Sequence, residues 1–203
     1  DAAPFPTSQP VSGGLAVHDR LTLEIARGCT RGCRFCHAGM VYRPVRERST
    51  DTLQKLLDES LAATGFEEVS LLSLSTGDYS GLDALFASSF DRCLAEQVSI
   101  SLPSLRVGSL SAPIMDRIAS IRRTGITLAP EAGSQRLRDV INKGITEDEL
   151  IEHVGKLFER GWQHVKLYFM IGLPTETEAD LEAIAALSRK VRDAAGQIGR
   201  AHV

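Results

Sequence analysis

Hydrophobic and polar residues follow two different periods along this chain. Alternation at every second residue predicts half-buried strands, whereas hydrophobic residues three or four positions apart predict helices with one buried face. Leu21, Leu23 and Ile25 alternate with polar or small residues and predict the first strand. Further strands are predicted at 69–75, 98–102, 126–129 and 165–171. Helices are predicted at 52–64, 82–94, 113–124, 134–142, 147–160 and 176–193.

Local signals mark the ends of two of these helices. Gly65 follows the first predicted helix and is a natural C-terminal stop. Thr146 and Glu149 have the spacing of a capping box at the start of the helix at 147–160. Five strands thus alternate with helices, which predicts an α/β fold with parallel strands and right-handed crossovers.

The two faces of the predicted strands differ in polarity. The last strand has one face of Val165, Leu167, Phe169 and Ile171 and an opposite face of Lys166, Tyr168 and Met170. Strands of a doubly wound sheet are covered by helices on both faces and are almost continuously apolar. We therefore predict a TIM-like barrel with a polar interior. Glu24, Lys166 and Tyr168 are expected to point into it, either as a Lys–Glu pair or as substrate contacts.

The composition is that of one soluble globular domain. The chain has 203 residues, 43% of them hydrophobic and 24% charged, and a net charge of −3 that does not call for a nucleic-acid partner. No stretch approaches the roughly 18 apolar residues of a membrane span, and the start has no signal peptide. We expect a cytoplasmic protein without a membrane partner.

The first residues have the composition of a linker. Asp1 stands where a Met is usual, and proline and glycine are frequent up to Gly14. We expect residues 1–19 to be a linker from a missing upstream domain, and residues 20–203 to form the globular domain.

Three of the four cysteines, Cys29, Cys33 and Cys36, fall within eight residues after the first predicted strand. This crowding disfavours a disulfide framework and favours a metal or catalytic site in a reducing compartment. Three thiolates on a 4Fe–4S cluster leave one iron open to an exogenous molecule. The alternatives are a zinc site completed by His37, or a loop of free thiols.

The Cys-x-x-x-Cys-x-x-Cys motif, with an aromatic residue before its last cysteine, resembles the radical S-adenosylmethionine superfamily. The resemblance implies that the cysteines bind three irons of a 4Fe–4S cluster, and that the fourth iron chelates the amino and carboxylate groups of S-adenosylmethionine. It further implies a set of cofactor contacts at the strand ends: Phe35, Ser75, Thr76, Gly77, Asp78, Ser104, Arg106, Glu131, Gly172, Leu173 and Pro174.

Within that set the resemblance distributes the roles by position. The segment 75–78 is implied to hold the methionine amino group, Ser104, Arg106 and Glu131 the ribose and carboxylate, and the segment 172–174 the adenine. The chain has Ser-Thr-Gly-Asp where the superfamily has Gly-Gly-Glu, so its carboxylate is one methylene shorter. The superfamily core also has six strands, so we expect a partial (βα)6-type barrel, truncated at 200–203 before its sixth strand.

More narrowly, residues 28–49, 73–79 and 129–144 resemble a poorly characterised family of large radical enzymes with a cobalamin-binding-type domain upstream. The resemblance implies reductive cleavage of S-adenosylmethionine to a 5′-deoxyadenosyl radical, which abstracts hydrogen from an unknown substrate. It also implies a reductant such as flavodoxin or ferredoxin and, through the missing upstream domain, cobalamin.

Two other functions stay open at this point. An RNA-modifying enzyme of the methylthiotransferase type would share the core, and a non-catalytic iron–sulfur or zinc module would use the cysteines structurally. Arginines at positions 27, 31, 34, 43, 46 and 48 either bind a polyanion or form an ion-paired rim around an anionic cluster. Cys93 is expected in the core, and His153 and His164 at the surface.

Overall fold

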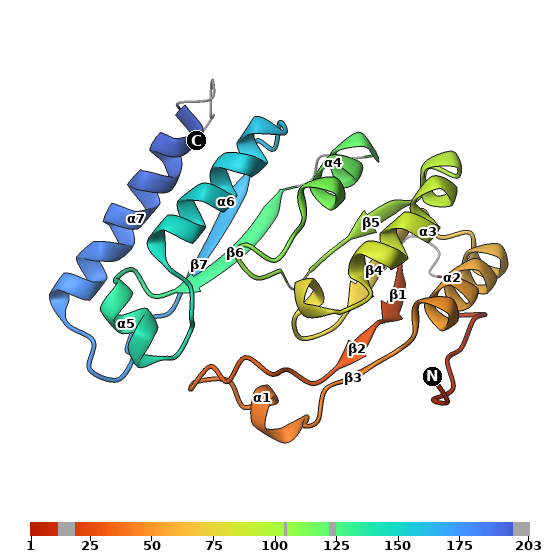
Figure 1. The fold of residues 1–203 in the computed structure, drawn as a ribbon, viewed down its shortest axis with the longest axis horizontal. Coiled ribbons are helices and arrows are strands. Elements are labelled where there is room, and N and C mark those ends of the chain that lie inside the picture. The colour runs from red at the N-terminus through yellow and green to blue at the C-terminus, as the bar shows by residue number, and fades with distance from the viewer. Residues whose placement is uncertain (12–18, 104, 122–124, 197–203) are drawn as a thin grey trace.

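The structure, a computed structural model, describes residues 1–11, 19–103, 105–121 and 125–196. Five strands alternate with helices along the chain, as the sequence predicts (Figure 1). They are β1 (Leu21–Glu24), β4 (Glu68–Leu72), β5 (Ser99–Ser101), β6 (Ile126–Glu131) and β7 (Val165–Phe169). β4 lies between β1 and β5 in one parallel sheet, and β6 pairs in parallel with β7 in another. The predicted α/β class and the parallel strands are confirmed.

The longer helices follow one another along one side of the strands in Figure 1. They are α2 (Thr50–Thr64), α3 (Leu82–Ala95), α4 (Ala112–Ile121), α6 (Glu147–Glu159) and α7 (Glu178–Gly196). Several short elements were not predicted: α1 (Ala38–Val41), the 3-10 helix η1 (Thr76–Asp78), and the antiparallel pair β2 (Ala26–Arg27) and β3 (Arg46–Glu47). The antiparallel pair of β2 and β3 closes the base of the loop that contains the three cysteines. The remaining helix, α5 (Gln135–Val140), was predicted slightly longer.

The core lies between the strands and these helices. Leu21 and Leu23 of β1 stand opposite Val69 and Leu71 of β4, and all four side chains are buried. Helix residues complete the same cluster, among them Leu53, Leu57, Leu85, Phe86, Leu150 and Val154. Each such side chain contributes about 1.5–3 kcal/mol when fully buried. The apolar face predicted for the strands is therefore the face that the helices cover.

The wall of strands is interrupted between β5 and β6. No ladder joins these two strands within the described part of the chain, and a space of about 180 Å³ lies between them, lined by Ile100, Leu102, Ile126 and Trp162 among others. The apolar core nevertheless continues from one sheet to the other, because Ile126 belongs to the same cluster as the residues of β1 and β4. The result is a partial barrel. The predicted truncation at 200–203 lies outside the described residues.

Side-chain chemistry sets the helix ends where the sequence places them. Gly65 has a left-handed φ of 70° after α2. Thr146 and Glu149 form the predicted capping box at the start of α6. Four strands are shorter than predicted: β1 ends at Glu24, β4 at Leu72, β5 covers only Ser99–Ser101, and β7 ends at Phe169.

The open face of the strands is less polar than predicted. Leu72 and Leu74, at the end of β4, are 46% and 45% exposed. Ile171, predicted on the helix-facing side, is 75% exposed because it lies beyond the end of β7. Period two fixes the faces only within a strand, so residues past a strand end escape it.

Of the two expectations for Glu24 and Lys166 inside the barrel, the Lys–Glu pair is wrong. Glu24 accepts hydrogen bonds from Arg27 at 2.9 and 2.8 Å. Lys166 instead lies 5.0 Å from the ring centroid of Tyr168, the next residue on the same face of β7. Glu24 therefore has its partner three residues away, in Arg27 of the adjoining β2.

Cys93 and His153 are both buried, which confirms one prediction and corrects another. Cys93 is fully enclosed on α3, and burial raises the pKa of its thiol to about 11. His153, expected at the surface, is only 4% exposed on α6, and its Nε2 has no hydrogen-bond partner among the residues that the structure describes. Burial, and then the charge of Lys156, lower the pKa of His153. Its place on the apolar stripe of α6, three residues after Leu150, was the available signal.

His153 should make the fold sensitive to mild acid. Because its pKa is lower in the folded than in the unfolded chain, the unfolded chain takes up the proton first and stability falls as pH drops below about 6.5, by up to about 1.4 kcal/mol per pH unit. Urea unfolding of wild type and His153→Leu between pH 8 and 5.5 should show this loss only in wild type. The control is His164→Leu, at an exposed position. Equal pH slopes in wild type and His153→Leu would contradict the prediction.

Candidate functional site

The candidate residues gather where the parallel strands end. The cysteine loop, residues 27–48, follows β1 through β2, the segment 73–78 follows β4, and Glu131 ends β6. Residues 170–174 follow β7. Because parallel strands present their carboxyl ends at one edge, segments far apart in sequence meet there, and ligand sites of α/β folds occupy this edge.

The cysteine loop is built to leave its thiols available. Cys29, Cys33 and Cys36 are free and half-buried. Gly28 has a φ of 98°, and a Cβ there would collide with the carbonyl oxygen of Tyr42. Glycine is therefore required where the loop leaves β2, because other residues would be strained and would clash.

The three thiols form a donor set without yet surrounding one point. Within the described residues, no three Cys, His, Asp or Glu side chains are placed to hold one metal ion. His37 is exposed and begins α1, so the arrangement does not complete a zinc site with it. Three unpaired thiols on one glycine-opened loop nevertheless have the chemistry that an iron–sulfur cluster requires. Binding a cluster then requires the thiols to turn toward one another.

The segment after α5 holds the tip of the cysteine loop. The backbone N–H of Arg34 donates to the carbonyl of Ile141 at 2.9 Å, and its guanidinium donates to the carbonyl of Val140. Asn142 donates from its amide to the carbonyl of Gly32 at 2.9 Å. These contacts connect residues more than one hundred positions apart. They fix the loop against the second sheet.

Lys143, in the same segment, joins two predicted cofactor contacts. Its ammonium lies 3.1 Å from Glu131 and 5.9 Å from the ring centroid of Phe35. Both Lys143 and Glu131 have largely buried side chains. Arg106 donates to the carbonyls of Lys143 and Gly144. The structure thus brings Phe35, Arg106 and Glu131 to one place, where their partners are within the chain.

Asp78 connects the end of β4 to the cysteine loop. Arg31 donates to it from Nε at 2.7 Å and also from Nη2, and Ser75 donates from its hydroxyl at 2.7 Å. The hydrogen bonds of Arg31, and secondarily of Ser75, lower the pKa of Asp78. The carboxylate is therefore held in its ionised form beside the cysteines.

The neighbours of Asp78 in the predicted set are constrained by packing. Thr76 is fully buried, and its hydroxyl is 3.0 Å from that of Ser73. Gly77 lies so close to Ser109 that a Cβ would clash with its side chain. Packing therefore accounts for these two residue types, whereas Ser75 and Asp78 remain at the edge of the site.

The segment predicted to contact adenine is partly packed. Gly172 has a φ of 81°, and its N–H donates to the carboxylate of Glu176 at 2.6 Å. Leu173 is buried in a small second cluster with Ala132, and Pro174 is exposed. The last predicted contact, Ser104, lies outside the described residues.

Sequence reasoning missed the buried guanidinium that organises this half of the site. Arg138, on α5, is 1% exposed and donates to the carbonyls of Ala132, Gly133 and Ile145 at 2.9 to 3.1 Å. Burial lowers the pKa of Arg138. It connects the two ends of the segment 132–145, which directly follows Glu131 and carries Asn142. The signal in the sequence was an arginine next to Leu137 within a short helix.

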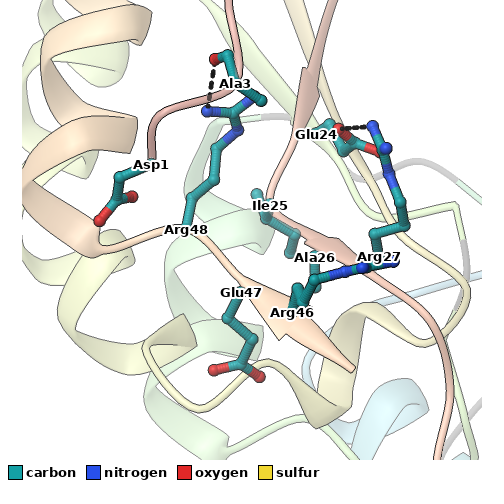
Figure 2. A pocket seen from close by; sticks show the side chains of 9 residues that line it. All are labelled: Asp1, Ala3, Glu24, Ile25, Ala26, Arg27, Arg46, Glu47 and Arg48. Atoms are coloured by element: carbon teal, nitrogen blue, oxygen red, sulfur yellow. Dashed lines mark hydrogen bonds and ion pairs between the residues drawn. The ribbon is translucent and has the colours of Figure 1, made fainter. Parts of the chain in front are cut away.

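Most of the loop arginines have partners within the chain. Besides the contacts of positions 27, 31 and 34, Arg43 donates to the carbonyl of Gly39 and Arg48 to that of Ala3. Arg46 is exposed and makes no such contact within the described part of the chain. Figure 2 shows it beside a pocket of about 140 Å³ under the N-terminal segment. Five of the six arginines therefore have partners within the chain, but among the described residues the expected ion pairs are formed by two of them, Arg27 with Glu24 and Arg31 with Asp78, whereas the other three donate to backbone carbonyls.

A larger hollow opens beside the cysteine loop. It measures about 430 Å³ and is lined by Glu24, Gly28, Tyr42, Leu72 and Leu74 among others. The wall is mainly apolar, with one carboxylate that is already paired. Its position next to Gly28 makes it the candidate space for a substrate.

Comparison with protein families gives one result. The family model described as the Radical SAM superfamily matches residues 23–187. This range includes all three loop cysteines, the end of β1 and the whole of the other four parallel strands. The cofactors expected from the sequence, a 4Fe–4S cluster and S-adenosylmethionine, are those of this superfamily.

Comparison with curated proteins finds longer relatives. An uncharacterized protein of Methanocaldococcus jannaschii is 39% identical over 188 residues, which cover 93% of this chain and 41% of that protein. A tRNA-2-methylthio-N(6)-dimethylallyladenosine synthase of Chloroherpeton thalassium is 30% identical over 182 residues, covering 84% of this chain and 39% of that protein. The chain thus spans about two fifths of the length of these relatives.

Comparison with solved structures confirms the fold. The radical S-adenosylmethionine methyltransferase TsrM from Kitasatospora setae, with tryptophan and a SAM analogue bound, gives a TM-score of 0.65 at 18% identity, over 83% of this chain and 34% of that chain. The cobalamin-dependent radical enzyme OxsB, with aqua-cobalamin and S-adenosylmethionine bound, gives a TM-score of 0.62 at 18% identity, over 83% of this chain and 26% of that chain.

Within the described ranges, no helix is both long and apolar enough to cross a membrane.

Replacing Arg138 should destabilise the site. Arg138→Met keeps the length of the side chain but leaves buried carbonyls without donors, and hydrogen bonds to a charged group are worth about 1.5–3 kcal/mol each. We expect the free energy of unfolding to fall by about 2–4 kcal/mol in urea titrations. Arg189→Met, at an exposed position of α7, is the control and should change little. An equal, small effect of both substitutions would show that Arg138 does not organise the segment.

Proposed function

Because the chain belongs to the radical SAM superfamily, whose members are enzymes, we propose that it is the core that binds a 4Fe–4S cluster and S-adenosylmethionine. One observation carries this proposal: Cys29, Cys33 and Cys36 are free thiols on a loop fixed at the carboxyl edge of the parallel strands. A structural metal module would not need the loop to lie beside Asp78, Glu131 and a hollow of about 430 Å³.

In this proposal the three cysteines hold three irons and leave one iron free for the cofactor. When bound, the cluster and S-adenosylmethionine supply a one-electron reductive cleavage that yields methionine and a 5′-deoxyadenosyl radical. That chemistry would serve hydrogen abstraction from a substrate, and the protein's own contribution would be to bind and orient the cofactor and the substrate and to exclude water.

Several residues of this chain would contribute to binding and orienting the cofactor. Gly28 lets the loop turn, and Asn142 holds its tip, so the thiols stay at the strand edge. The ammonium of Lys143 makes a cation–π contact with the ring of Phe35, the residue before Cys36. Among the residues proposed to contact the cofactor, Ser75, Asp78 and Gly172 have polar groups at the carboxyl edge of the strands. Thr76 and Leu173, by contrast, are buried in the packed interior.

The chain's partners follow from the same chemistry. A radical enzyme needs a one-electron donor, for which flavodoxin or ferredoxin is the proposed class, and its cluster requires a reducing compartment such as the cytoplasm. Residues 1–19 are proposed as a linker to an upstream domain, and the fold similarity to OxsB and TsrM supports cobalamin as a cofactor of that domain.

Reconstitution under anaerobic conditions tests the proposal. Wild type, treated with iron and sulfide and reduced with dithionite, should hold about four irons per chain. Its EPR signal should shift when S-adenosylmethionine is added, and 5′-deoxyadenosine should form. Cys33→Ala should lose the intact cluster, the shift and the product. Cys93→Ala is the matched control, because that buried thiol lies in the core and should leave all three unchanged.

Two outcomes would contradict the proposal. A folded wild type that holds only zinc, or a cluster whose EPR signal ignores S-adenosylmethionine, would leave a structural metal module as the better description.

RNA modification is a second candidate, favoured by the methylthio-tRNA synthase among the relatives and by Arg46. Phosphate contacts make binding fall steeply with salt. If RNA is the substrate, wild type should bind tRNA at low salt, and Arg46→Ala should weaken binding and lower the slope of log K against log salt by about 1. Gel-shift titrations at several salt concentrations measure both, with the exposed Arg189→Ala as control. Absence of binding at low salt would remove this candidate.

A further inference from the structure

The hollow beside the cysteine loop has an apolar wall that follows from the alternation of β4. Val69 and Leu71 are buried under the helices, so Leu72 lies on the opposite, open face of the same strand. Leu72 and Leu74 are 46% and 45% exposed there, and Tyr42 of the cysteine loop is 49% exposed. All three line the hollow of about 430 Å³. Apolar side chains are thus presented to the hollow rather than to the packed core.

The charged side chains that line the hollow neutralise each other. In the described part of the chain these are Glu24, beside Leu72 in the register of β1 and β4, and Arg27. Glu24 accepts from Nε and Nη2 of Arg27 at 2.9 and 2.8 Å, and Figure 2 shows the two side chains joined. These hydrogen bonds are the main cause that lowers the pKa of Glu24, so its carboxylate stays ionised and paired.

A charged ligand would therefore gain little in the hollow. It would lose hydration against an apolar wall, and it would have to break the Glu24–Arg27 pair to find an opposite charge. An uncharged ligand loses little hydration and covers the exposed leucines, which is favourable. The lining of the hollow thus selects by charge.

The neighbouring pocket under the N-terminal segment has the opposite character. It measures about 140 Å³ and also borders Glu24 and Arg27, but most of its lining residues are charged, among them Arg46 and Arg48. The Glu24–Arg27 pair thus separates a small charged pocket from a larger apolar hollow.

The larger hollow has the dimensions of a ligand site rather than of a flat docking face. Ligand pockets commonly measure about 300–1,000 Å³ and are lined mainly by apolar side chains with few polar groups. Gly28 lies in the wall and directly precedes Cys29. A group held in the hollow would therefore lie next to the first cysteine of the loop.

We propose that this hollow binds an uncharged aromatic or hydrocarbon group of the substrate, in contact with Leu72, Leu74 and Tyr42. The assignment rests on the proposed function and adds the chemical class of the substrate. The Glu24–Arg27 pair acts as a specificity element, because it keeps both charges of the wall occupied.

Two probes with one ring skeleton test the charge selectivity without the substrate and without turnover. N-phenyl-1-naphthylamine is uncharged, and 1-anilinonaphthalene-8-sulfonate is the same molecule with a sulfonate added. Equilibrium dialysis against the reconstituted chain, under anaerobic conditions, measures both dissociation constants. We expect the uncharged probe to bind wild type at least about tenfold more tightly than the sulfonate.

A substitution in the wall locates the probe. Leu74→Asp places a charge in the hollow and should weaken the uncharged probe at least about tenfold. Leu94→Asp is the matched control, because Leu94 is 38% exposed on α3 and is not among the residues that line the hollow. It should leave the affinity unchanged. The melting temperature of each variant shows whether it is folded.

Glu24→Gln tests the role of the ion pair. The substitution keeps the size of the side chain but leaves Arg27 without its carboxylate. The sulfonate should therefore bind about two- to fivefold more tightly, whereas the uncharged probe should not. The gain is small because the side chain of Arg27 is 56% exposed.

Added S-adenosylmethionine distinguishes a substrate site from a cofactor site. Saturating S-adenosylmethionine should not displace the uncharged probe from wild type, since a substrate group and the cofactor must be bound together. Displacement would assign the hollow to the cofactor.

Four results would overturn the inference: equal wild-type affinities for the two probes, equal effects of Leu74→Asp and Leu94→Asp, unchanged sulfonate binding in Glu24→Gln, and displacement by S-adenosylmethionine. In each of these a wild type that holds its cluster and shows the EPR shift leaves the proposed function standing. A wild type without the cluster or the shift overturns the proposed function, and with it the assignment of the hollow to a substrate.

Discussion

The cysteine loop has little apolar packing of its own, so its position depends on polar contacts from distant parts of the chain. Asn142 and the backbone of Ile141 hold the tip of the loop, and Asp78 holds Arg31 between the first two cysteines. The first contacts come from the segment after β6 and the last from the end of β4. The loop therefore bridges two sheets that no ladder joins within the described residues, and any chemistry of its thiols depends on that bridge.

The bridge itself rests on a buried charge. Arg138 gathers the carbonyls of Ala132, Gly133 and Ile145, which bracket the segment that contacts the loop. A buried guanidinium is costly unless its donors are satisfied, and here backbone carbonyls rather than a carboxylate satisfy them. Such a site has one stable arrangement, because moving either end of the segment would leave buried polar groups unpaired. Arg138 thus holds in place the segment whose residue Asn142 binds the tip of the cysteine loop.

The errors of sequence reasoning share one physical cause. A pair between Glu24 and Lys166 inside the barrel was one of two expectations, but Glu24 instead accepts hydrogen bonds from Arg27, three residues away. His153 was expected at the surface because no partner pattern accompanies it in the sequence, yet α6 buries it among apolar neighbours. In both cases the side chain's partner, or lack of one, depends on which elements pack around it. The period of hydrophobic residues predicts only on which face of a helix or strand a residue lies, not which side chain it contacts.

The alternation of strands and helices, the capping of α2 and α6, and the cysteine motif could all be predicted without the structure, because each depends on residues within a few positions of one another. The sequence also placed the candidate residues at strand ends, and parallel strands bring those ends together. Three features became visible only in the folded chain: the break between β5 and β6, the burial of Arg138, and the pairing of Arg31 with Asp78. Each of these depends on side chains that meet across long stretches of sequence, where the local pattern holds no information about the partner.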